Sequence, residues 1–283
     1  MTNHRERSAP PNGNSNLRVR ALNFEFPITS FALKVAVLLS LALVLWGLMS
    51  PAYGAERLWQ KTLKLSPGGH VSVVNVHGSV MVEGWDRSEV EATVAMRSPG
   101  STDQLDDVQV AVEAREGAVT FHTLYPPGLD APVQVDYRLR VPRQVRLDEI
   151  STLQGDIVVR DVDGSIEARN LHGDIEGIDV SGSVVAHALT GNILVSLRAL
   201  PDPRQPVQLG TINGNVDLVL PTQANADLAL YTLAGNIVSG YPYLVSSTPG
   251  DSTRHAKVGA GGVPVELRTV RGNIHVGQRN DDL

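Results

Sequence analysis

Glycine recurs at a fixed spacing in the second half of the chain, and apolar and polar residues alternate around it. Between Gln154 and Ile193, a glycine followed by a small polar residue and then a β-branched residue recurs every nine residues, at Gly155, Gly164, Gly173, Gly182 and Gly191. Glycine permits corners with positive φ, and β-branched residues favour strands. The pattern therefore predicts short strands separated by tight corners.

The copies are of two alternating kinds, so the true period is eighteen residues. One kind reads TLQGD, NLHGD and ALTGN and continues at Gly214, Gly235 and Gly272; the other reads DVDGS and DVSGS, with an early copy, NVHGS, at Gly78. A single copy cannot bury its own apolar face, whereas copies stacked ~4.8 Å apart build a continuous core. The repeat thus predicts a stack of coils, each made of two half-repeats.

We therefore predict an all-β fold in which residues 151–283 form a β-solenoid of 18-residue coils. Residues 55–150 show alternating strands without the regular repeat and are predicted to form an antiparallel β layer that caps one end of the solenoid, because an open end is an unpaired sheet edge. The core is expected to contain the apolar residues on both sides of each corner glycine, including Leu153, Val162, Leu171, Val180 and Leu189.

Later copies are spaced less regularly. From Gly191 onward the glycine-to-glycine steps are 23, 21 and 37 residues, or one period plus five, one plus three, and two plus one. The extra residues include Pro201 to Pro206, Pro221 and the polar stretch Ser246 to Gly262. Such compositions are typical of loops, so we expect insertions at coil corners in a stack that otherwise follows chain order.

Residues 1–54 are predicted to be a signal peptide. The first 34 residues carry five basic groups, and the charge-free run 35–48 that follows reaches about 21 Å as a helix, short of a ~30 Å hydrocarbon core. Ala52 and Gly54 suit cleavage before Ala55. The alternative is an uncleaved anchor over residues 31–53. Both interpretations predict an exported protein, periplasmic or on the cell surface.

The composition limits which kinds of partner and of anchoring or metal site are expected. The chain has no cysteine, which excludes a lipobox anchor, disulfides and thiolate zinc sites. Residues 1–54 hold 5 of the 24 basic and 2 of the 30 acidic residues, so the rest has a formal charge of −9. This sign disfavours nucleic acid and anionic lipid as partners. Membrane contact is expected only through the N-terminal segment, if it stays uncleaved.

The acidic residues after the glycines suggest one metal hypothesis. Asp156 and Asp174 should lie in one column of the stack, continued by asparagines, and stacked oxygen ligands could bind calcium. Asp161 and Asp179 should lie in a second column. The competing interpretation is that the Asp and Asn residues of both columns hydrogen-bond the turn backbone and tolerate left-handed geometry. A column that changes from Asp to Asn loses ligand charge, so we predict no metal and no cofactor.

No coherent catalytic constellation is found in the sequence. The carboxylates form a regular ladder that a repeat produces by itself, the histidines lack metal-ligand spacing, and no G-x-S-x-G nucleophile motif occurs. Tyr241 and Tyr243 flank Pro242 in an expected loop and are candidate contact residues. Tyr125 is a weaker candidate, and Trp85 is expected to be a packing anchor.

The chain resembles one known family. The segment NVHGSVMVEGWDR from Asn75, the strand end Arg140-Val141-Pro142 and the serial TLQGD-like copies resemble the bacterial "putative adhesin" domain family of unknown function. The resemblance spans residues 63–276 and implies a β-solenoid on the cell envelope. Its motifs are structural glycines and strand residues, so it implies no catalytic residues.

Three functions follow as hypotheses. The leading one is a non-enzymatic binding or scaffolding module of the bacterial envelope, adhesin-like, that meets an envelope protein or a glycan through its faces and inserted loops. The second is a membrane-anchored partner in envelope stress or regulation. The third is a glycan-active β-helix enzyme that uses paired carboxylates.

Overall fold

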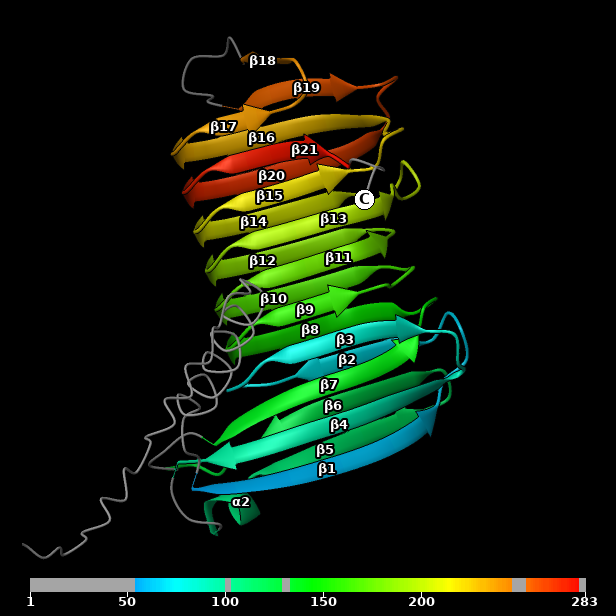
Figure 1. Cartoon of the computed structure of the whole chain (residues 1–283), viewed down its shortest axis with the longest axis vertical. Helices are drawn as coiled ribbons and strands as arrows, with labels where there is room; N and C mark the ends of the chain where they lie inside the picture. Colours follow the sequence, from blue (N-terminus) through cyan, green and yellow to red (C-terminus); the bar gives the residue numbers. More distant parts are fainter. Residues whose placement is uncertain (1–53, 100–102, 129–132, 246–252, 280–283) are drawn as a thin grey trace, which may run out of the picture. The chain divides into compact units, whose positions relative to one another are not determined.

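The computed structural model describes residues 54–99, 103–128, 133–245 and 253–279, and it shows an all-β protein with two large mixed sheets (Figure 1). In spatial order, the 10-stranded sheet contains β1 (Ala55–Lys64), β4 (Glu89–Ser98), β7 (Gln134–Pro142), β3 (Val80–Trp85), β9 (Ile157–Arg160), β11 (Ile175–Ser181), β13 (Ile193–Ala199), β15 (Val216–Leu220), β21 (Ile274–Gln278) and β17 (Ile237–Ser239). The 11-stranded sheet contains β18 (Tyr243–Val245), β19 (Arg254–Val258), β16 (Ala226–Ala234), β20 (Val263–Arg271), β14 (Val207–Asn213), β12 (Val184–Thr190), β10 (Ile166–His172), β8 (Arg146–Gln154), β2 (His70–Val74), β6 (Ala118–Leu124) and β5 (Gln109–Arg115). A five-residue helix, α2 (Asp103–Asp107), contacts β1 and β4.

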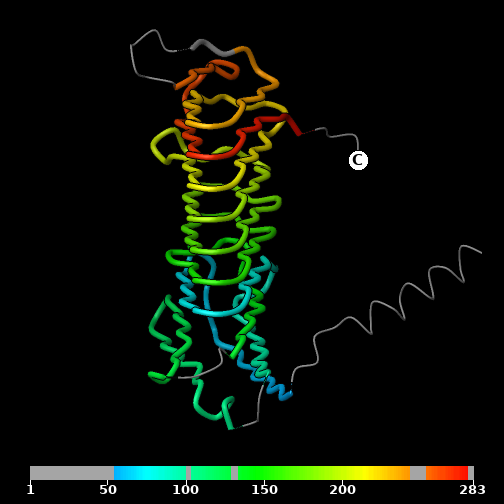
Figure 2. The backbone as a smooth tube through the Cα atoms, turned by 90° about the vertical axis from the view of Figure 1, so that its left-hand side faces the viewer, coloured from blue at the N-terminus to red at the C-terminus, as the bar shows by residue number. Residues whose placement is uncertain are grey.

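Alternate residues of both sheets point into one shared apolar core. In β10, Ile166 and Ala168 are buried, whereas Glu167 and Arg169 face outward. This two-residue alternation is what a strand with one covered face requires. From β8 to β15, successive strands belong to the two sheets in turn, and the backbone passes from one sheet to the other at each corner (Figure 2).

The predicted period of eighteen residues is confirmed in the middle of the chain. Ile157 pairs with Ile175, and Ile175 with Ile193, in parallel strands of the 10-stranded sheet. The step of 23 residues is confirmed too, because Ile193 pairs with Val216. The additional residues lie between β13 and β14, where the sequence predicted a proline-rich insertion.

The expectation of a stack in strict chain order is wrong at the C-terminal end. β21 lies between β15 and β17, and β20 lies between β14 and β16. Val216 therefore pairs with Ile274, and Ile274 in turn pairs with Ile237. After β15, the chain forms β16 and β17 one strand position further along each sheet. The intervening positions are occupied by β20 and β21, which come later in the chain. Residues 254–258, expected in a loop, form β19, while residues 246–252 lie outside the described residues.

The predicted antiparallel layer over residues 55–150 is right for three strand pairs and wrong for four. β1 with β4, β4 with β7, and β5 with β6 are antiparallel. β2, however, pairs in parallel with β6 and β8, and β3 does so with β7 and β9. The β2–β3 coil is therefore inserted out of chain order, and the predicted boundary at residue 150 falls inside β8. NVHGS, assigned above to the second kind, stacks its glycine on Gly155 of the first kind.

The predicted signal peptide or anchor lies outside the described residues, apart from Gly54. Among the helices of the described part, none is long and apolar enough to span a membrane. The described residues all belong to one compact unit.

Candidate binding surface on the 11-stranded sheet

The repeat glycines form the corners of the stack, and their backbones touch. Seven follow one another in space as Gly78, Gly155, Gly173, Gly191, Gly214, Gly272 and Gly235, while Gly182 stacks on Gly164 in a second column. A Cβ added at Gly191, whose φ is +148°, would lie 1.9 Å from the carbonyl oxygen of Gly173. Neither that φ nor that space suits a side chain, so these glycines set the corner geometry.

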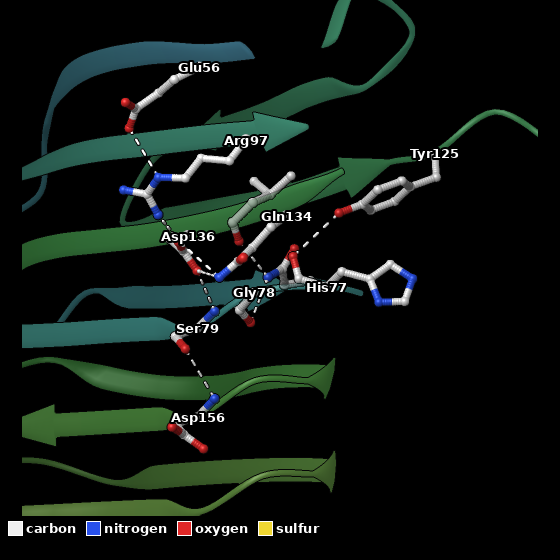
Figure 3. A network of polar contacts seen from close by, with 11 residues as sticks. Glu56, His77, Gly78, Ser79, Arg97, Tyr125, Gln134, Asp136 and Asp156 are labelled. Carbon is white, nitrogen blue, oxygen red and sulfur yellow. Dashed lines mark hydrogen bonds and ion pairs between the residues drawn. The ribbon is translucent and has the colours of Figure 1, made fainter. Parts of the chain in front are cut away.

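The predicted column of Asp and Asn residues forms a ladder of hydrogen bonds. The Oδ1 atom of Asp156 accepts the backbone N–H of Asp174 at 2.9 Å, and Asp174 accepts that of Asn192 at 2.7 Å. The same bond at 2.8–2.9 Å continues through Asn215, Asn273 and Asn236. The ladder starts at Asp136, which accepts the N–H of Ser79, whose hydroxyl accepts the N–H of Asp156 (Figure 3).

This geometry favours the hydrogen-bonding interpretation of Asp156 and Asp174 over the calcium hypothesis. Each carboxylate uses one oxygen to accept a backbone amide, and the amide oxygen of Asn does the same one coil further on. Asp and Asn are equivalent in that role, which explains why the column changes from one to the other. Over the described ranges, no three His, Asp or Glu side chains are grouped so that they could hold a metal ion.

A second ladder lies inside the corners and was not predicted. At five corners, the residue three positions before the glycine donates a side-chain hydrogen bond to the glycine carbonyl of the neighbouring coil: Thr152 to Gly78 (3.0 Å), Asn170 to Gly155 (2.7 Å), Thr211 to Gly191 (2.9 Å), Thr269 to Gly214 (2.9 Å) and Thr232 to Gly272 (2.8 Å). The signal was the Thr or Asn that opens TLQGD and NLHGD. Burial makes each bond valuable, because an unpaired buried carbonyl costs free energy.

Ala188 interrupts this inner ladder, since it has no donor for the carbonyl of Gly173. We expect Ala188→Thr to raise the free energy of unfolding by about 1 kcal/mol, because it supplies the missing hydrogen bond. Urea denaturation measures the change. Ala188→Val has the same shape without the hydroxyl and is the control. Equal stability of the two variants would contradict the role given to the hydroxyl.

The leucines two positions before the first kind of glycine do not enter the core, which corrects the sequence prediction. Leu153, Leu171 and Leu189 are 47%, 37% and 37% exposed, whereas Val162 and Val180 are fully buried as predicted. In the first kind, the residue three before glycine points inward, so strand alternation turns the leucine outward. In the second kind, the left-handed φ of Asp161 (+57°) and Asp179 (+54°) resets the alternation, so the valine turns inward.

These leucines belong to an apolar column on the outer face of the 11-stranded sheet. Strand register places Leu171 beside Leu189, because their neighbours Asn170 and Ala188 are paired. The same register extends the column across β6, β2, β8, β10, β12, β14, β20 and β16. In spatial order, the apolar column consists of Leu124, Val76, Leu153, Leu171, Leu189, Ile212, Val270 and Leu233. All except Val76 and Val270, which are half-buried, count among the exposed large hydrophobic residues.

A shallow hollow opens beside the apolar column where Gly210 leaves the outer face without a side chain. It has a volume of 390 Å³, and its lining includes His187, Tyr231 and Arg268 together with Ile212 and Val270 of the column. The guanidinium of Arg268 lies 5.0 Å from the centre of the Tyr231 ring and pairs with Glu266 at 3.2 Å. The hollow therefore combines apolar walls with one cationic group, the guanidinium of Arg268, that is already paired.

The opposite corners carry ion pairs. Arg143 contacts Asp86 at 3.0 Å and Asp161 at 3.1 Å, and Arg279 contacts Asp179 at 2.5 Å. Burial would raise the pKa of Asp163, but hydrogen bonds from Ser181 and Arg198 outweigh it and hold the pKa below its usual range. Because these groups are partly exposed, they contribute little to stability, and their carboxylates are already engaged.

The aromatic candidates Trp85, Tyr125 and Tyr241 are not members of the apolar column, although Tyr125 directly follows its member Leu124. Trp85 donates from Nε1 to the carbonyl of Glu89 at 2.9 Å and stacks under Arg87, which agrees with a packing role. Tyr125 donates to the carbonyl of Val133 at 2.7 Å, and burial raises its pKa (Figure 3). Tyr241 packs partly buried against the core, and Tyr243 begins β18. The contact role of the last two stays a prediction.

Comparisons with known proteins find distant likenesses among solved structures and no matching family model or curated protein. A "putative cell adhesion protein" from Clostridium sporogenes is 12% identical, with a TM-score of 0.40 over 79% of this chain and all of that one. A "putative adhesin" from Bacteroides fragilis is 10% identical, with a TM-score of 0.43 over 79% of this chain and 97% of that one. A "putative lipid binding protein" from Parabacteroides distasonis is 9% identical, with a TM-score of 0.24 over 79% of this chain and 97% of that one. Likenesses at this level assign no ligand or activity to the chain.

Proposed function

We propose that this chain is a non-enzymatic binding and scaffolding module of the bacterial cell envelope that contacts a protein partner through its apolar column. The observation that carries the proposal is the column itself, in which eight apolar side chains, seven from strands and Val76 from the bend after β2, stand side by side on an outer sheet face. Contiguous apolar patches of a few hundred Å² on soluble domains commonly mark interaction sites.

The architecture supports a scaffolding role. Strands β8 to β15 alternate between the two sheets and pair in parallel at steps of 18 or 23 residues, which supports a β-solenoid as the underlying fold. In such a stack each residue of the repeat becomes a straight column, so one repeated leucine produces an extended contact surface. We infer export from the predicted signal segment, with the mature module in the periplasm or on the cell surface.

A protein fits the apolar column better than a glycan does. Its members are aliphatic, and aliphatic side chains match the apolar centre of a protein interface, whereas glycan sites rely on aromatic faces and polar groups. Polar residues flank the column at the corner, as in the rim of an interface: His172 and Thr190 are exposed, and Asn213 is half-buried. The carboxylates of Asp156 and Asp174 are engaged in the ladder, which gives the glycan-active enzyme no support.

Replacing Leu171 and Leu189 together by Gln tests this function. Both side chains are exposed, so the fold should be retained, while the loss of apolar contact should lower partner binding at least tenfold. Cross-linking in intact envelopes, followed by capture of the protein, measures the yield of specific cross-linked products. Leu194→Gln is the matched control, because Leu194 is 39% exposed on the other sheet. Unchanged products in the double variant would refute the proposal.

A further inference from the structure

We propose that the partner on the apolar column is a second copy of this chain, so that the module forms a two-fold dimer through the outer faces of its 11-stranded sheets. This inference rests on the proposed function, because it names the occupant of the same surface. Its basis is the regular spacing of the apolar column, the area the column presents and the charge balance beside it.

The spacing of the column favours a partner with the same spacing. Neighbouring strands lie ~4.8 Å apart, and the apolar column crosses seven strands and the bend that follows β2, so its side chains form a regular row of ridges and grooves. Only another stack of strands repeats at this interval along its length. Two such rows interdigitate over their whole length, as identical side chains do in dry interfaces between stacked sheets. A second copy provides this match at every step.

The area of the column suits a dimer. Its six most exposed members are 37–68% exposed, from Leu171 and Leu189 at the centre to Leu233 at one end. Together they present roughly 500 Å² per copy, or about 1,000 Å² in a two-fold interface, which is the lower bound for a specific association. The hollow at Gly210 adds 390 Å³ of space that a side chain of the second copy can enter.

The charges beside the column do not oppose self-association. Arg169 pairs with Glu167, and Arg268 pairs with Glu266, both on the outer face of the same sheet. Arg271 donates to the side chain of Asn213 at 3.2 Å. Because the basic residues nearest the column already have partners, two identical faces meet without a large uncompensated charge, although the whole chain is acidic.

The absence of cysteine permits a clean test on the full protein. Leu171 and Leu189 are the two central members of the column, so a two-fold axis along or across the column brings them close to their counterparts. We expect the purified protein to sediment as a dimer, and the Leu171→Gln, Leu189→Gln variant to raise the dissociation constant at least tenfold. Leu194→Gln should leave it unchanged. A short bismaleimide should join two copies of Leu189→Cys and not two copies of Leu194→Cys.

The possible outcomes distinguish a failure of the dimer from a failure of the proposed binding function. A protein that remains monomeric at about 100 μM, with no cross-link at Leu189→Cys, overturns the dimer. If envelope cross-links to a different protein still depend on Leu171 and Leu189, the binding function stands with another occupant. A dimer that persists unchanged in the double Gln variant, with cross-linking equal at both cysteine positions, also overturns the inference, because the contact then lies elsewhere.

Discussion

Deleting residues 263–283 is expected to unfold β16, β17 and β19 as well as to remove β20 and β21. In a stack that followed chain order, loss of the last coil would leave the preceding coils in place. Here β20 lies between β14 and β16, and β21 lies between β15 and β17. Without them, Leu228 and Leu230 of β16 lose the strand that joins them to the rest of the core. The stack up to β15 should remain folded, because its own pairs are intact.

Hydrogen exchange measured by mass spectrometry tests this expectation. Amides of residues 226–239 should lose their protection in the truncated protein, while those of β10 to β13 keep it. A shorter truncation that removes only residues 280–283 is the control and should leave both regions protected. Retained protection over 226–239 in the longer truncation would mean that β16 moves onto β14 directly, and it would contradict the role of the inserted coil.

Gly191→Ala is expected to destabilise the protein by roughly 4 kcal/mol, a large effect for a single methyl group. Two causes add. The φ of +148° is unfavourable for a residue with a Cβ, and the new Cβ would meet the carbonyl oxygen of Gly173 at 1.9 Å. The backbone cannot yield locally, because that carbonyl belongs to a corner that itself stacks on Gly155.

Substitutions at two other glycines distinguish the two causes, backbone strain and steric clash. Gly117 has a φ of +72° with open space around it, so Gly117→Ala should cost only about 1 kcal/mol from backbone strain. Gly164 has no positive φ, but a Cβ added there would lie 1.9 Å from the carbonyl oxygen of Val145, so the cost of Gly164→Ala measures the steric clash alone. Chemical denaturation of the three variants gives the ranking. A cost at Gly191 no larger than that at Gly117 would show that the corners can separate.

Local chemistry made much of the fold predictable from the sequence. The nine-residue spacing identified the corners, and the alternation of two kinds of copy gave the eighteen-residue period that the pairing of Ile157, Ile175 and Ile193 confirms. The proline-rich insertion before Val207 was also predictable, because Pro201, Pro203 and Pro206 cannot continue a central strand. The column of Asp and Asn was foreseen as well, including its role in hydrogen bonding.

The candidate surface was not predictable in the same way. It depends on which residues of each strand point inward and which point outward next to the corner. A leucine before Gly173 and a valine before Gly182 occupy the same place in the nine-residue pattern. One faces solvent and the other the core, because Asp179 adopts a left-handed φ of +54° and shifts the alternation by one residue. A one-residue shift reverses which face a side chain occupies, and hydrophobicity alone does not reveal it.

The sequence by itself determined the length of a coil, the position of its corners and the residues that join one corner to the next. Only the tertiary structure decided which coil lies beside which: Gly78 beside Gly155, and Gly272 between Gly214 and Gly235. The physical reason is that parallel backbone pairing is nearly the same for every coil of a repeat. The choice among equivalent neighbours therefore rests on the packing of the whole stack and not on the pairing within any one coil.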